Sequence, residues 1–184
     1  MRLYFATGNK GKYAEVARIA AEFGIRLEQL KGSKFEIQSD DLQEIAAFAA
    51  KQACDANHNA VVAEDSGFFV HALGGFPGPY SSYAYRTIGN EGILKLLRST
   101  DRRDAHFLAS VAYCEPKQQP VCFRGIVKGV VSRRSIGNSG FGFDPIFKPT
   151  QGDGRTFAEM TANEKNQLSH RARAFTKLFK WLAV

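Results

Sequence analysis

Six residues near the N-terminus, Thr7, Gly8, Asn9, Lys10, Gly11 and Lys12, combine glycines and lysines in a pattern that suits phosphate binding. They follow a strand-like run and precede a segment with helical spacing, so N–H groups and the positive end of the helix dipole face outward. The pattern is not a P-loop, which needs G-x-x-x-x-G-K followed by Ser or Thr, because Tyr13 follows Lys12. An ordinary strand–helix turn with a surface lysine explains the same residues equally well.

Two adjacent carboxylates, Glu64 and Asp65, come at the end of the apolar run 60–63, followed by Ser66. Charge in such a place is costly unless a cation or hydrogen bonds compensate it, and strand ends are common ligand sites. Glu36 is a further acid inside an apolar run. With Asp65 it could supply the one or two carboxylates that Mg²⁺ takes beside water and phosphate oxygens. Each acid alone is more simply explained as a turn cap or a solvated strand edge.

A third candidate segment places two aromatic side chains on a glycine-rich backbone, at Phe141, Gly142, Phe143 and Asp144. An aromatic ring could stack on a base, and Asp144 could accept a hydrogen bond from the N–H edge of that base. Two core phenylalanines beside a turn aspartate are an equally good interpretation. The four histidines lack the spacing of zinc ligands, so a zinc site is not expected.

The elements that position these residues can be predicted from periodicity and caps. Strand-like runs cover 2–7, 25–30, 35–37, 60–64 with an extended continuation, 105–114 and 121–131, and the last two predict an antiparallel pair. Helical spacing covers 10–23, 41–56 and 90–97, where Asn90 is the expected cap, and a tail that Thr161 and Glu164 open as a capping box. The segments 73–82 and 137–142 are rich in glycine and predict ordered loops. This irregular alternation predicts an α/β fold with a long mixed sheet.

Composition sets the limits of the interpretation. With 184 residues, of which 44% are hydrophobic, the chain suits one domain over 1–184. It has neither a membrane-spanning run nor a secretory signal, and its three cysteines lack a paired spacing, so we expect a reduced, cytoplasmic protein. The net charge of +7 favours phosphate-bearing partners without deciding between nucleotides and nucleic acid.

Four segments taken together resemble one known family. TGNKGK, EDSGFFVHALGGFPGPYS, SGFGFDPIF and FAEMTANEKNQLSHRARAF occur in this order across nearly the whole chain, and they resemble the inosine triphosphate pyrophosphatase family. The resemblance implies an elongated, two-lobed α/β fold with a long, curved, mixed sheet flanked by helices and an active-site cleft between the lobes. It also implies a homodimer that uses Mg²⁺ to hydrolyse ITP, dITP and XTP to the nucleoside monophosphate and pyrophosphate, which clears these nucleotides from the pool.

The resemblance also assigns roles to single residues. Thr7 to Lys12 would hold the triphosphate, and Lys51 would be a helical lysine directed at the phosphates. Glu36 and Asp65 would bind the metal, with Asp65 also the general base. The remaining assignments are to the substrate, with Ser66 as a contact, 141–144 as the base-binding loop, and Lys165, His170 and Arg171 as the group that reads the six-position of the purine. One departure is that many bacterial members have an E-N-A run before the helical lysine, where this chain has 46–48 as Ala-Ala-Phe.

The expected reaction is attack of water on the α-phosphorus, with Asp65 accepting the proton and Mg²⁺, Lys12 and Lys51 stabilising the phosphate charge. Three alternatives remain at this stage. A pyrophosphatase for other modified nucleotides would use the same chemistry. A basic nucleic-acid-binding module would bind oligonucleotides in a salt-sensitive way. A non-catalytic nucleotide sensor is disfavoured because every expected acid and lysine is present. We expect neither nucleic acid nor membrane as a partner.

Overall fold

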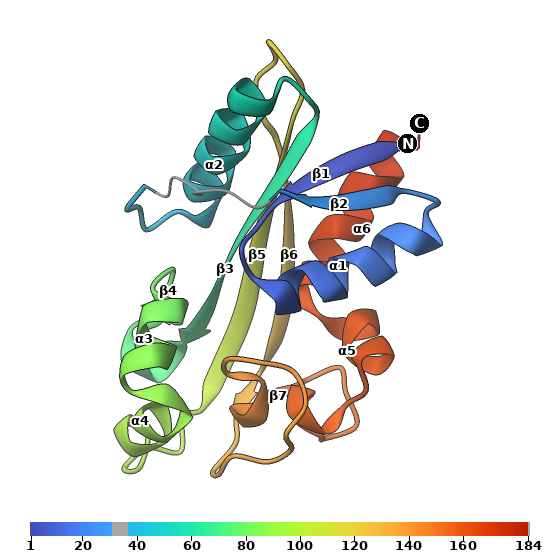
Figure 1. Cartoon of the computed structure of the whole chain (residues 1–184). Coiled ribbons are helices and arrows are strands. Elements are labelled where there is room, and N and C mark those ends of the chain that lie inside the picture. The colour runs from blue at the N-terminus through green and yellow to red at the C-terminus, as the bar shows by residue number, and fades with distance from the viewer. Residues whose placement is uncertain (31–36, 184) are drawn as a thin grey trace. The chain divides into compact units, whose positions relative to one another are not determined.

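Short apolar runs form a mixed sheet of seven strands flanked by helices in the computed structural model, which describes residues 1–30 and 37–183 (Figure 1). The strand order is β2-β1-β3-β5-β6-β7, with β4 paired to β3. β1 is parallel to β2 and β3, whereas β3–β4 and β6–β7 are antiparallel. The strands are β1 Arg2–Ala6, β2 Arg26–Leu30, β3 Val61–Val70, β4 Pro77–Gly78, β5 Asp104–Cys114, β6 Val121–Val131 and β7 Phe147–Pro149. The expected α/β fold with a mixed sheet is therefore confirmed.

Six α-helices lie in the described part of the chain: α1 Lys10–Glu22, α2 Leu42–Asn57, α3 Ser81–Thr87, α4 Gly89–Leu96, α5 Ala162–Leu168 and α6 His170–Leu182. Three short 3₁₀ turns cover His71–Leu73, Asp144–Ile146 and Phe157–Glu159. The predicted capping box of α5 forms as expected, because Thr161 accepts from the N–H of Glu164 and Glu164 accepts from the N–H of Thr161. No helix in the described ranges is both long and apolar enough to cross a membrane.

The chain groups into two compact units, and β3, β5 and β6 contribute residues to both. The first unit takes the described residues of Met1–Asp65, Ala109–Gly125 and Arg171–Val184, and the second takes Ser66–Leu108 and Ile126–His170. Two units agree with the two lobes that the resemblance implies. The single-domain organisation and the cleft between the lobes stay predictions.

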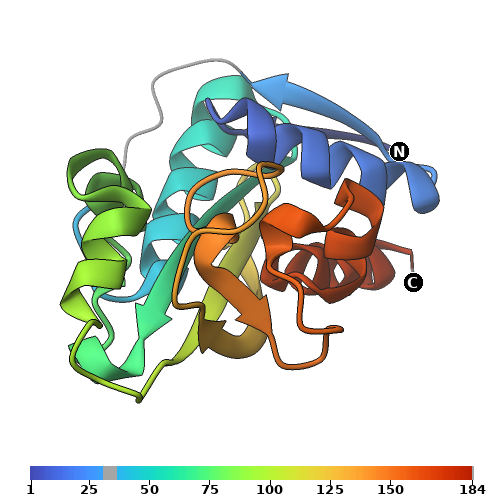
Figure 2. The same cartoon turned by 90° about the horizontal axis from the view of Figure 1, so that it is seen from below.

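In the first unit, the alternation of side chains along the strands separates two hydrophobic clusters. Phe5 and Val62 pack with the apolar residues of α1 and α6, which lie side by side in Figures 1 and 2. Val61 and Ala63 belong instead to the cluster that contains the buried residues of α2. Because successive side chains of a strand point to opposite faces, α2 covers one face of this part of the sheet and α1 with α6 covers the other.

Aromatic rings dominate the core of the second unit. Phe68 of β3 lies 4.7 Å from Phe107 and 5.1 Å from Phe143, measured between ring centroids. Phe147 and Phe157 complete this group at 5.2 Å from each other. The group anchors the glycine-rich loop 137–142, because Phe143 directly follows that loop and is buried.

The structure corrects three expectations from the sequence. The short helix α3 was not predicted, and α4 has Ile88 at its cap, so the predicted role of Asn90 as the cap was wrong. Gly89, with a φ of +61°, makes the sharp turn between α3 and α4, and the Asn90 side chain donates instead to the carbonyl of Gly142 at 3.3 Å. The predicted strand at 35–37 falls largely outside the described residues.

The third correction concerns the acidic pair. β3 continues to Val70, so Glu64 and Asp65 lie in the middle of a ten-residue strand rather than at its end. The strand extends because Phe68 and Val70 enter the aromatic core of the second unit. The position of Asp65 is therefore also the point where the strand leaves the first unit.

Candidate active site

The N-terminal turn is a polar structure fixed by its own side chains. Asn9 caps α1, and its side-chain oxygen accepts from the N–H of Lys12 at 3.0 Å. Thr7 accepts from the N–H of Asn9 at 3.2 Å, and Gln29 donates to the Thr7 carbonyl at 2.8 Å. The first turn of α1 carries no acidic residue. The positive end of the helix dipole is therefore not neutralised locally, which favours an anion at this turn.

Glycine at position 8 has no conformational explanation, because Gly8 does not adopt a positive φ and an added Cβ would meet nothing within 4 Å. Gly8 and Lys10 are exposed, whereas Gly11 is partly buried. The turn therefore presents a bare backbone to the outside, which is what close approach of a phosphate needs.

Four charged side chains of the first unit form what we call the buried charge cluster: Lys12, Glu15, Glu64 and Arg171. The Lys12 ammonium lies 2.7 Å from one oxygen of Glu64, and Arg171 lies 3.1 Å from the other. Arg171 also contacts Glu15 at 2.5 Å. The Glu64 side chain is fully buried and that of Arg171 is 2% exposed. Two positive and two negative charges compensate one another, as buried ions must.

This cluster gives Arg171 a different environment from the one expected for a residue that reads a purine. Its guanidinium contacts two carboxylates. His170 is also buried, and its ring stacks on Phe107 at 4.7 Å. The base-reading roles of both residues stay predictions.

Sequence reasoning assigned no role to Glu15, and for Glu64 it predicted only that a cation or hydrogen bonds must compensate its charge. The signal for Glu15 was available, because it lies three residues after Lys12 and so on the same side of α1. Its partner was not visible in the sequence, because Arg171 is 156 residues away along the chain.

Asp65 lies on the opposite face of β3 from Glu64. Val62 shares its face with Glu64, and Val61 and Ala63 face α2, so the alternation of the strand puts Asp65 on the α2 side. Asp65 and Ser66 are both partly buried. A partly buried carboxylate fits a hard cation that takes few protein ligands, whereas the Glu64 carboxylate is shared by two cationic side chains.

The other predicted metal ligand, Glu36, falls outside the described residues. Among those that are described, no group of three or more His, Cys, Asp or Glu side chains gathers in one place. Mg²⁺ is usually held by one or two carboxylates together with water and substrate phosphates, so Asp65 remains a suitable ligand.

Lys51 projects from α2 and contacts Asp55 at 2.6 Å, one helical turn further on. The hydrogen bond to Asp55 raises the pKa of Lys51, so the ammonium stays charged. This contact is partly exposed, and exposed pairs of this kind are weak. Lys51 could therefore exchange Asp55 for a phosphate at little cost, and its predicted role stays a prediction.

The loop 141–144, which is predicted to bind the base, is held by a buried ion pair between Asp144 and Lys165, 2.5 Å apart, with each side chain 4% exposed. The same oxygen of Asp144 accepts from the N–H of Phe141 at 2.9 Å. The Lys165 ammonium lies 4.8 Å from the centre of the Phe141 ring. Gly140 has a φ of +74°, and a Cβ there would lie 2.1 Å from Asp144. Asp144 thus fixes the backbone of the loop and also holds Lys165 beside the ring.

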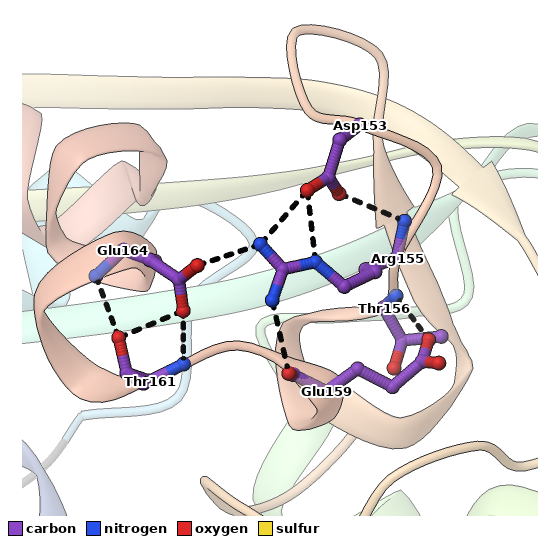
Figure 3. Close-up of polar contacts among 6 residues, drawn as sticks. All are labelled: Asp153, Arg155, Thr156, Glu159, Thr161 and Glu164. Carbon is purple, nitrogen blue, oxygen red and sulfur yellow. Dashed lines mark hydrogen bonds and ion pairs between the residues drawn. The ribbon is translucent and has the colours of Figure 1, made fainter.

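The helix that carries Lys165 is anchored by a network of exposed polar groups (Figure 3). Arg155 contacts Asp153 at 2.8 Å and Glu164 at 2.6 Å. Glu164 also accepts from the N–H of Thr161 at 2.7 Å, which fixes the first turn of α5. Because Glu164 directly precedes Lys165, this network sets the start of the helix from which Lys165 reaches Asp144.

The anchoring of α5 should depend on pH. The hydrogen bond from Arg155, followed by the N–H of Thr161, lowers the pKa of Glu164 from 4.5 to about 2. A lowered folded-state pKa stabilises the fold above pH 4.5, and this contribution is lost as the pH falls toward 2. We expect Glu164→Gln to lower the melting temperature at pH 7, and the gap to the wild type to narrow below pH 4.5. Calorimetry from pH 7 to pH 3 measures this gap, with the exposed Glu91→Gln as the control. A gap that stays constant over this range would contradict the assignment.

Comparison with known proteins places this geometry in a family. The sequence model of the Ham1 family matches residues 3–181. The chain is 48% identical over 181 residues to a protein of Methanopyrus kandleri named dITP/XTP pyrophosphatase, covering 98% of this chain and 96% of that one. A protein of the same name from Saccharolobus solfataricus is 49% identical over 176 residues, which cover 96% and 91% of the two chains. The solved structure of the Staphylococcus aureus Ham1 protein superposes with a TM-score of 0.85 at 29% identity and covers 100% of this chain and 98% of that one.

Proposed function

Because this chain belongs to the Ham1 family, we propose that it is a nucleoside triphosphate pyrophosphatase that hydrolyses ITP, dITP and XTP to the monophosphate and pyrophosphate. Its role is to clear these nucleotides from the pool before they enter DNA or RNA, and its place of action is the cytoplasm. The relatives are named dITP/XTP pyrophosphatase, which supports dITP and XTP as substrates. The observation that carries the proposal is that Lys12, at the phosphate-binding turn, is held by Glu64, the neighbour of Asp65 on β3.

Different residues bind the phosphates, accept the proton and neutralise charge in the proposed reaction. The N-terminus of α1, with Lys12, binds the phosphates, and Lys51 adds a second positive charge from α2. Asp65 takes the proton of the water whose oxygen attacks the α-phosphorus. The bond from that phosphorus to the oxygen bridging to the β-phosphate breaks, and this oxygen leaves with pyrophosphate. Mg²⁺, held by Asp65 and Glu36 beside the phosphates, would supply further charge neutralisation.

The preference for deaminated purines rests on the loop at Phe141 and on a donor for the six-oxo group. Of the three predicted donors, Lys165 is the one whose charged group lies against an aromatic ring of the loop. A purine stacked on Phe141 would bring its edge close to this ammonium. Adenine has an amino group at the six-position, which would face the Lys165 ammonium as one hydrogen-bond donor against another. An unpaired polar group of this kind can favour ITP over ATP by about 10⁴-fold.

A substrate panel tests the proposal. We expect pyrophosphate release from ITP, dITP and XTP with Mg²⁺, much slower release from ATP, and loss of activity when the metal is removed with EDTA. The measurement is the initial rate of pyrophosphate formation at a fixed nucleotide concentration. Equal rates for ATP and ITP would overturn the base selectivity. No pyrophosphate from any nucleotide, together with salt-sensitive oligonucleotide binding, would instead favour the nucleic-acid-binding alternative.

We also propose that the chain forms a homodimer. The family resemblance supports this, and so does the number of exposed apolar side chains in the segment 76–88, namely Phe76, Tyr80, Tyr83, Tyr85 and Ile88. Exposed apolar side chains are typical of protein interfaces where they lie together. Light scattering at micromolar concentration gives the mass, and a monomer would contradict the proposal.

A further inference from the structure

We propose that Glu15 and Arg171 are positioning residues for Lys12. In this relay, which rests on the proposed function, Glu15 orients Arg171, Arg171 orients Glu64, and Glu64 holds Lys12 where the triphosphate binds. Glu15 and Glu64 need not touch the substrate, and Arg171 acts on Lys12 separately from its predicted contact with the purine. Their effect on the reaction would pass through the place and charge of the Lys12 ammonium.

The relay joins three elements of the first unit. Glu15 and Lys12 come from the first half of α1, Glu64 from β3, and Arg171 from the start of α6. Arg171 uses one terminal nitrogen for Glu15, at 2.5 Å, and the other for Glu64, at 3.1 Å. The guanidinium is planar, and its nitrogens are fixed relative to one another. A contact at Glu15 therefore determines the direction of the contact at Glu64.

The exposure of the four side chains shows which of them is able to move. Lys12 is 17% exposed, whereas Glu15, Arg171 and Glu64 are 10%, 2% and 0% exposed. Lys12 is therefore the member that can turn from Glu64 to a phosphate. When Lys12 turns away, the contact of Arg171 with Glu64 still compensates part of the buried negative charge. Arg171 thus lowers the cost of releasing Lys12.

Loss of the Glu15 contact should disturb this balance without removing a substrate contact. Without the carboxylate of Glu15, both terminal nitrogens of Arg171 can turn to Glu64. The Glu64 carboxylate then shifts, and the Lys12 ammonium that it holds shifts with it. Displacement of a binding group by about 1 Å can cost up to 10²-fold in rate. We expect about a tenfold loss of kcat/KM for ITP in Glu15→Gln, and a similar loss of affinity for inorganic tripolyphosphate, which carries the phosphate chain without a base.

If the Glu15–Arg171 contact only held α1 and α6 together, the kinetic results would differ. Such a contact acts on folding, so the effect of Glu15→Gln on kcat/KM would be the same with and without Lys12. A relay acts through Lys12, so in a Lys12→Gln background the Glu15 substitution should have no further effect on kcat/KM. The cycle of Glu15→Gln, Lys12→Gln and the double variant separates the two explanations. Glu22→Gln, an exposed acid at the end of the same helix, is the matched control and should behave as the wild type.

The experiment measures kcat and KM for ITP, melting temperature, and tripolyphosphate affinity by calorimetry for these variants. The relay is supported if the double variant matches Lys12→Gln within twofold. It is overturned if Glu15→Gln keeps wild-type kinetics and affinity, or if its tenfold loss recurs in the double variant. If Glu15→Gln does not fold, Arg171→Lys replaces it in the experiment. This variant keeps the charge but lacks the planar guanidinium, and it should show the same loss of kcat/KM. Tripolyphosphate affinity needs no turnover, so a wild type that releases no pyrophosphate would refute the proposed function while the calorimetry still tests the relay.

Discussion

Replacing Asp65 by asparagine should lower kcat for ITP by about 10²-fold or more while the fold stays intact. The substitution keeps the size of the side chain and removes both its negative charge and its ability to accept a proton. Asp65 is only partly buried, and it lies on the face of β3 opposite the buried charge cluster. The compensation between Glu64, Lys12 and Arg171 should therefore be unaffected, and the loss should come from chemistry rather than from stability.

Single-turnover kinetics and melting temperature together measure this prediction. Asp101→Asn is a suitable control, because that carboxylate is 90% exposed and pairs with the exposed side chain of Arg133. The control should retain full activity. Near-normal turnover of Asp65→Asn would remove Asp65 from the mechanism. A large fall in melting temperature would show that the residue has a structural role instead.

Replacing Lys165 by methionine should cost about 3–5 kcal/mol of folding free energy, because it leaves the Asp144 carboxylate buried without its cation. Both side chains are 4% exposed, and the Lys165 ammonium lies 2.5 Å from the Asp144 carboxylate. Methionine retains most of the volume, so the loss would report charge rather than a cavity. The same variant should lose much of its preference for ITP over ATP, since the proposed donor to the six-oxo group is gone.

Denaturant unfolding measures the stability change, and the double variant Asp144→Asn with Lys165→Met identifies its cause. With both charges removed, much of the lost stability should return, because no unpaired buried charge remains. The exposed Lys95→Met on α4 is the control and should be close to neutral. If the single and double variants were equally unstable, the pair would not be the source of the loss. An unchanged ratio of ITP to ATP rates would exclude Lys165 as the base-reading donor.

The expectations that held rest on short-range physics. The capping box of Thr161 and Glu164 forms because both partners lie within one helical turn, and the helix at 42–57 follows from an apolar face and an acidic cap. The turn from Thr7 to Lys12 joins β1 to α1 as predicted, for the same reason. Residue type and spacing are sufficient wherever the partner is a neighbour in the chain.

The expectations that failed depend on partners that are distant in the chain. Asn90 has the composition of a helix cap, yet its amide donates to Gly142, which lies 52 residues away. Glu64 and Asp65 were expected at a strand end, but the aromatic core beyond them extends β3 to Val70. A local pattern can indicate that a polar group needs a partner. It does not indicate which distant element supplies that partner.

By itself the sequence determined which chemical groups are present: a glycine and lysine turn suited to phosphate, acids on a buried strand, an aromatic glycine loop, and the order of motifs that identifies the family. Only the tertiary structure decided which charges meet. It paired Arg171 with Glu15 and Glu64, placed Asp65 on the opposite face from Glu64, and bound Lys165 to Asp144. The physical reason is that a buried charge must be compensated in three dimensions, and its partner is set by the packing of strands and helices rather than by spacing along the chain.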